Sequence, residues 1–210
     1  VAALLSASYC ADPQPVPILV YHRVLEDPEG PPLTVMSTRL FRAQMAWLAE
    51  NGYQPVTLRR VYDSWTGEAL LPPKPVVLTF DDGYADQVRN AAPVLREYGW
   101  PAELGLVSTA LYLGDDPPAT SLTPEMVQDL LDDGWGLESH SVTHVDLTRL
   151  WGEKLRRELV DSRTRLVAVT SCSNVTGVKV PVERWASMAH AHRVPILVDG
   201  QCIGAVGVSG

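Results

Sequence analysis

Short apolar runs typical of buried strands alternate with segments of helical periodicity over residues 18–139. The strands that this pattern predicts are Ile18–Tyr21, Val56–Leu58, Val76–Phe80, 104–108 and Gly136–Ser139. The predicted helices are Leu40–Asn51, 86–98 and a segment that begins after Thr123, a good N-cap residue, and ends near Gly134. Strands alternating with helices indicate a parallel sheet covered by helices, open or closed into a barrel.

Composition narrows the classes of partner. The chain has 210 residues, 46% of them hydrophobic, which is enough for one substantial core. A net charge of −8 argues against nucleic acid as a partner, and an acidic surface fits a neutral or cationic substrate such as an amino sugar. No stretch approaches the ~20 apolar residues of a transmembrane span.

The first residues and the cysteines leave alternatives open. Residues 1–12 fit the remnant of an export signal, and they fit a plain terminus or a buried first strand equally well. The three cysteines, Cys10, Cys172 and Cys202, form neither a CxxC pair nor a disulfide framework, so they say little about the compartment.

Ligand-type side chains follow directly on three of the predicted strands. His22 follows the first strand, Asp81 and Asp82 follow the strand that ends at Phe80, and His140 follows the strand that ends at Ser139. In folds with parallel sheets the chemistry lies where strands end and loops begin. The sequence therefore predicts one site that these residues share.

Two motifs suggest what that site binds. Adjacent carboxylates such as Asp81 and Asp82 repel each other unless a cation or a proton lies between them, and Gly83 permits the tight turn that aims them differently. His140 and His144 lie on one face if their segment is helical, so both imidazoles can reach one divalent ion. Taken singly, each motif also fits a solvated turn or a pair of hydrogen-bonded loop histidines. Together they favour a metal site.

These motifs resemble those of the polysaccharide deacetylases, or NodB-like carbohydrate esterases. The family motifs TFDDG and HSxTH stand here at Thr79–Gly83 and His140–His144, and the resemblance extends over about residues 16–160. It implies a distorted (β/α) barrel that removes N- or O-acetyl groups from a glycan outside the cytoplasm, in the cell envelope or secreted. The implied partner is an acetylated glycan; the oligomeric state is not predicted.

The resemblance also assigns roles. Asp82, His140 and His144 would bind a divalent metal, with Zn²⁺ the first choice, and Asp81 would be the catalytic base. Ser141 and Thr143 would hold the two histidines in orientation. His22 would lie on the barrel rim, where a structural role is equally compatible with the sequence.

The second half of the chain departs from the family. The third motif, of the Tyr-Pro-Tyr-Gly type, and the later general-acid histidine are not found after residue 160. Residues 164–200 instead resemble a class V aminotransferase or cysteine desulfurase, and residues 194–210 resemble the closing hairpin of GlcG-like proteins. We therefore expect a truncated deacetylase domain over 13–162 and an unrelated segment over 163–210; ordinary divergence is the alternative.

The expected fold is thus an incomplete (β/α) barrel with an atypical C-terminal αβ segment. We expect weak or absent turnover, because losing an oxyanion donor alone costs ~10²–10³ in rate. The alternative function is an inert metal- or glycan-binding barrel, and a pyridoxal-phosphate enzyme ranks last. His190 and His192 are two residues apart, on different faces of a predicted helix, which argues against a second metal site.

Overall fold

The structure, a computed structural model, describes residues 15–28, 34–159, 167–169, 196–198 and 201–203. Its centre is a parallel sheet in the order β1, β5, β6, β7, with β4 also paired to β5. These strands are β1 (Ile18–Tyr21), β4 (Gln54–Pro55), β5 (Pro75–Asp82), β6 (Glu103–Leu106) and β7 (Gly136–Ser139). The predicted parallel sheet is confirmed.

The barrel is incomplete, as predicted from the sequence. Within the described ranges β1 and β7 are edge strands, and no pairing joins them. Two short parallel strands, β2 (Arg23–Leu25) and β3 (Val35–Ser37), follow β1 as a separate pair. No helix among the described residues is long and apolar enough to span a membrane.

The C-terminal strands form a sheet of their own. It consists of β8 (Val167–Val169), β9 (Ile196–Val198) and β10 (Gln201–Ile203), with β9 parallel to β8 and antiparallel to β10. The hairpin expected near the end of the sequence is therefore confirmed. The predicted helix with His190 and His192, residues 1–12, Cys10 and Cys172 lie outside the described residues.

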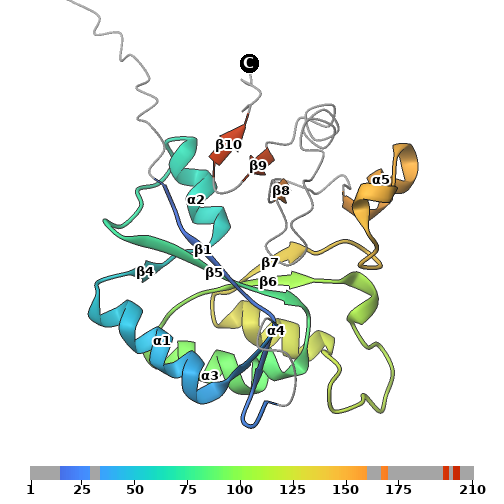
Figure 1. Cartoon of the computed structure of the whole chain (residues 1–210), viewed down its shortest axis with the longest axis horizontal. Helices are drawn as coiled ribbons and strands as arrows, with labels where there is room; N and C mark the ends of the chain where they lie inside the picture. Colours follow the sequence, from blue (N-terminus) through green and yellow to red (C-terminus); the bar gives the residue numbers. More distant parts are fainter. Residues whose placement is uncertain (1–14, 29–33, 160–166, 170–195, 199–200, 204–210) are drawn as a thin grey trace, which may run out of the picture.

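Three helices, α1 (Thr38–Glu50), α3 (Ala92–Tyr98) and α4 (Pro124–Asp132), cover one face of the sheet, whereas α2 (Leu58–Trp65) lies toward the other (Figure 1). The core between the three helices and the sheet is built around Phe80 of β5. Its ring lies 5.0–5.7 Å, centroid to centroid, from the rings of Tyr21, Phe41 and Trp135. This packing fixes β5, whose last two residues are Asp81 and Asp82.

Helix boundaries follow the capping residues. Ser37 caps α1 and Thr123 caps α4, each through a side-chain oxygen that accepts a backbone N–H three residues ahead. The strand predicted over Val56–Leu58 is wrong, because Thr57 caps α2 in the same way and Leu58 begins that helix. A local side-chain hydrogen bond outweighed the β-propensity of a short apolar run.

The helix predicted over 86–98 consists of two parts. A π-helical turn, η1 (Gln87–Ala91), precedes α3, and Gly99 ends α3 in the left-handed conformation. Helix α5 (Gly152–Leu159) and two 3₁₀ turns, η2 (Ser108–Ala110) and η3 (Leu147–Arg149), were not predicted. A π-turn at this place is informative, since such turns are frequent at functional sites.

A buried glutamate occupies the face of the sheet opposite the three helices. Glu103 is 2% exposed, and its Oε1 accepts a hydrogen bond from the backbone N–H of Leu58 at a distance of 2.5 Å. Its strand partner is Gly136, where an added Cβ would lie only 1.9 Å from Oε2 of Glu103. Burial raises the pKa of Glu103 to about 7, against the lowering effect of the Leu58 hydrogen bond.

This raised pKa predicts how stability depends on pH. The folded state holds the proton of Glu103 more tightly than the unfolded chain does. Protonated Glu103 therefore contributes its whole stabilising effect below pH 4.5, and this contribution is lost as the pH rises through about 7. Glu103→Gln keeps an acceptor for Leu58 and carries no charge. We expect it to raise the free energy of unfolding at pH 8 by up to about 3 kcal/mol, with no gain at pH 4. Urea unfolding at the two pH values measures the difference; equal gains at both would contradict the assignment.

Candidate metal centre

The strand register brings the predicted site residues to one edge of the sheet. Asp81 and Asp82 end β5, and His140 directly follows the end of β7. Both strands pair with β6, which lies between them, and all three run parallel, so their carboxyl ends meet. Gly105 of β6 is the partner of Asp81, and its lack of a side chain leaves room for the carboxylate, because an added Cβ would lie 3.0 Å from Oδ1.

Three side chains converge at this edge. Oδ1 of Asp82 lies 3.2 Å from Nε2 of His144 and 3.7 Å from Nε2 of His140. One ligand atom from each of the three residues lies within 4.8 Å of the other two. Two ligands at ~2.1 Å from a tetrahedral Zn²⁺ are about 3.4 Å apart, so small adjustments suffice to bind one.

The state of these donor atoms fits a cation. Oδ1 of Asp82 is buried and has no hydrogen-bond partner among the described residues, and a buried unpaired oxygen is costly. Burial lowers the pKa of His140, although the charge of Asp82 raises it. The lowered pKa favours the neutral imidazole that a metal requires. One carboxylate and two imidazoles are a typical ligand set for a catalytic zinc with an open position.

The histidine motif reaches this geometry without a helix. Residues 140–146 form a turn in which Ser141 and His144 have φ values of 68° and 55°, in the left-handed region. The proximity of the two imidazoles therefore comes from this turn and not from the helical spacing considered in the sequence analysis. Ser141 Oγ accepts a hydrogen bond from the backbone N–H of His144, and Thr143 Oγ1 donates to Glu158. These two side chains thus hold the backbone of the turn, not the imidazole rings.

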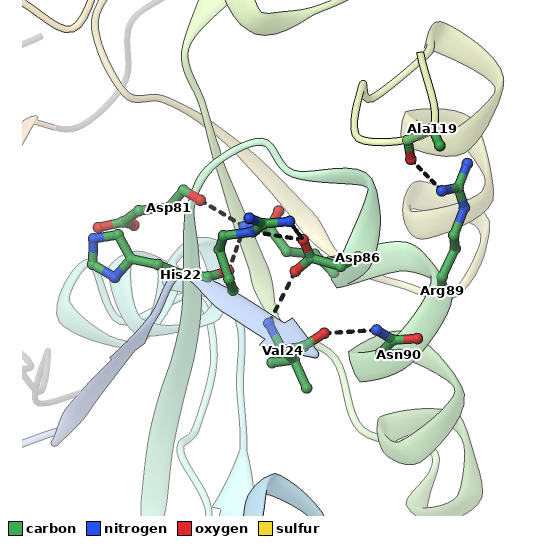
Figure 2. A network of polar contacts seen from close by, with 9 residues as sticks. His22, Val24, Asp81, Asp86, Arg89, Asn90 and Ala119 are labelled. Carbon is green, nitrogen blue, oxygen red and sulfur yellow. Dashed lines mark hydrogen bonds and ion pairs between the residues drawn. The ribbon is translucent and has the colours of Figure 1, made fainter. Parts of the chain in front are cut away.

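Asp81 occupies a different environment from Asp82. Burial raises the pKa of Asp81 to about 6, His22 lowers it, Asp82 raises it and His144 lowers it. Its Oδ2 is 4.0 Å from Nε2 of His140, farther than Oδ1 of Asp82 is from Nε2 of either histidine. Figure 2 shows the His22 ring beside the Asp81 carboxylate, so His22 lies next to the candidate site.

Sequence reasoning missed a network behind Asp81. The buried Gln87 donates from Nε2 to the backbone oxygens of His22 and Asp81, at 2.9 and 2.6 Å. Asp86 accepts from the backbone N–H of Val24 and from the Arg23 guanidinium, each at 2.9 Å (Figure 2). The π-turn therefore joins the end of β1 to the end of β5. A glutamine in line with the buried Ala91 and Leu95 on a helical stripe was the available signal.

Comparison with known proteins agrees with this geometry. The family model for polysaccharide deacetylase matches residues 69–191, more than half of the chain, and includes both motifs. The chain belongs to the polysaccharide deacetylase family. The matched range extends beyond residue 162, and the domain boundary expected there stays a prediction.

Individual members of the family are similar to this chain over different lengths. YxkH of Bacillus subtilis (strain 168) is 31% identical over 173 residues, 82% of this chain and 58% of YxkH. The poly-β-1,6-N-acetyl-D-glucosamine N-deacetylase of Escherichia coli (strain K12) is 40% identical over 82 residues, 39% of this chain and 12% of that enzyme. The chain thus spans less than two thirds of either relative.

A solved structure supports the family fold. The deacetylase PplD of Streptococcus pyogenes, in complex with acetate, superposes with a TM-score of 0.64 at 26% identity over 74% of each chain. A separate match joins 42 residues, 20% of the chain, to a cysteine desulfurase of Klebsiella pneumoniae at 48% identity. A similarity to cysteine desulfurases was expected from the sequence, and this match covers 10% of the desulfurase.

Proposed function

We propose that this chain is a metal-dependent deacetylase of an acetylated glycan, in which Asp82, His140 and His144 hold Zn²⁺ and Asp81 is the general base. The observation that carries the proposal is the buried, unpaired Oδ1 of Asp82 facing two imidazole nitrogens. A divalent ion bound there supplies Lewis-acid activation of water and of the acetyl carbonyl.

The residues of the chain supply the proton transfers. The Asp81 carboxylate accepts a proton from the water that attacks the acetyl carbonyl. The carbon–nitrogen bond of the amide then breaks, and acetate leaves together with the free amine. Asp81 can then return its proton to that amine. One water and one amide are consumed for each acetate and amine formed. Gln87 orients Asp81 through its backbone oxygen.

For the substrate we propose an N-acetylated glucosamine polymer, because the E. coli relative is named for poly-β-1,6-N-acetyl-D-glucosamine. The net charge of −8 is compatible with a product that becomes cationic on deacetylation. Such a polymer places the proposed activity outside the cytoplasm, in the envelope or the medium.

The test is acetate release from β-1,6-linked N-acetylglucosamine oligomers by the purified chain. We expect release that requires Zn²⁺, stops after chelation and returns when the metal is restored. The rate should lie ~10²–10³-fold below that of a relative with the third motif, because the motif expected to supply an oxyanion donor is not found in the given sequence. Binding of one metal equivalent without acetate release would favour the alternative of an inert metal- or glycan-binding barrel.

A further inference from the structure

The turn that carries the second and third proposed ligands is held in an unfavourable conformation. Ser141 and His144 are not glycines, yet both have φ in the left-handed region. Such residues are strained, and they persist only where surrounding contacts determine the backbone. The contacts that fix this turn are therefore the ones that place the His144 ring.

The side chain of Glu158 accepts hydrogen bonds from the polar groups at the centre of the turn. The carboxylate of Glu158 accepts hydrogen bonds from the backbone N–H groups of Val142 and Thr143 through Oε2, each at 2.9 Å. Its Oε1 accepts a third, also at 2.9 Å, from Oγ1 of Thr143. Charge-assisted bonds of this kind are stronger than bonds between neutral groups.

Glu158 is itself held in place by packing. It belongs to α5, and Leu155, three residues earlier on the same face of the helix, is 2% exposed. Burial of Leu155 anchors α5, so the carboxylate is presented to the turn from a fixed support. On the other side of the turn, η2 contributes the backbone N–H groups of Ser108 and Thr109, which donate to the oxygens of Ser141 and Val142.

We propose that Glu158 is a positioning residue for the metal centre, which clamps Val142 and Thr143 so that His144 meets Asp82. The inference rests on the proposed metal site. It assigns to α5 a role in metal affinity, although no residue of α5 is among the three ligands. Partners that orient metal ligands typically contribute 10–100-fold to affinity.

The test compares Zn²⁺ affinity of the full chain and three variants by competition with a chromogenic chelator. Glu158→Ala should bind Zn²⁺ 10–100-fold more weakly than the wild type, and Glu158→Gln, which keeps one acceptor oxygen, should lie between them. The matched control is Glu153→Gln, which removes a carboxylate from the same helix that pairs only with Arg156 and Arg157 in the described part of the chain. The control should stay within about twofold of the wild type.

A second measurement separates this inference from the proposed function. Amide hydrogen exchange at Val142 and Thr143, recorded without metal, should be faster in Glu158→Gln than in the wild type, whether or not zinc binds. A wild type that binds no Zn²⁺ would refute the metal site, and the exchange rates would still decide the role of Glu158. Wild-type affinity in both Glu158 variants, or unchanged exchange at both amides, would overturn the inference. If Glu158→Ala does not fold, Glu158→Gln supplies both readouts.

Discussion

Replacing Asp82 by asparagine should weaken Zn²⁺ binding by ~10²–10³-fold. Structural zinc sites with four ligands bind with ~10–16 kcal/mol, which corresponds to about 2.5–4 kcal/mol for each ligand. Asparagine is the informative replacement because Asp82 has a φ of 73°, and asparagine tolerates that conformation better than alanine does. The change thus removes the charged donor and leaves the turn unstrained.

The same variant should not lose folding stability without metal. Oδ1 of Asp82 makes no hydrogen bond within the described residues, and asparagine keeps a side-chain oxygen that can accept the hydrogen bond of the Tyr84 side chain to residue 82. Calorimetric titration with Zn²⁺ and thermal unfolding in the presence of a chelator measure the two quantities. Asp129→Asn, at an exposed position of α4, is the matched control. Zn²⁺ affinity within threefold of the wild type would remove Asp82 from the ligand set.

Replacing Asp81 by asparagine should separate catalysis from binding. If Asp81 is the general base, the rate of acetate release should fall ~10²–10⁴-fold, because an amide cannot accept the proton of the attacking water. Zn²⁺ affinity should change only a few-fold, since the carboxylate of Asp81 lies farther from the histidines than that of Asp82. Asparagine preserves the shape over Gly105 and the backbone oxygen that Gln87 holds.

Two measurements on Asp81→Asn decide between the roles of the adjacent carboxylates. Acetate release is followed at saturating Zn²⁺, and affinity is obtained from the same calorimetric titration as for Asp82→Asn. Parallel loss of affinity and rate would make Asp81 a ligand. An unchanged rate would mean that another group accepts the proton.

The sequence predicted the parts of this molecule that depend on pattern and strand order. Apolar runs located β1, β5 and β7. The two residues after the apolar run of β5 are Asp81 and Asp82, so that run also located the two carboxylates at the end of the strand. Capping residues located the start of α4. Parallel strands end at the same edge of their sheet, so residues that follow two such strands were expected to lie at one edge. Asp82 and His140 were expected to converge for this reason.

Other features depended on contacts between distant residues. The turn at His140–His144 looked helical in spacing, but hydrogen bonds to Glu158 and to η2 impose left-handed residues that no local pattern reveals. Gln87 and Asp86 act on backbone groups more than 60 residues away in sequence, so their partners could not be read from the helix that contains them. In the same way, the start of α2 depended on a single hydroxyl of Thr57.

The opposition of Glu103 and Gly136 has an evolutionary consequence. A Cβ at position 136 would lie 1.9 Å from Oε2 of Glu103, so a side chain at position 136 requires the buried glutamate to move or to be replaced by a shorter residue. A shorter residue at position 103, in contrast, meets no such clash while position 136 is glycine. The constraint therefore has a direction: in the relatives we expect replacement of the glutamate to precede any side chain at the place of Gly136.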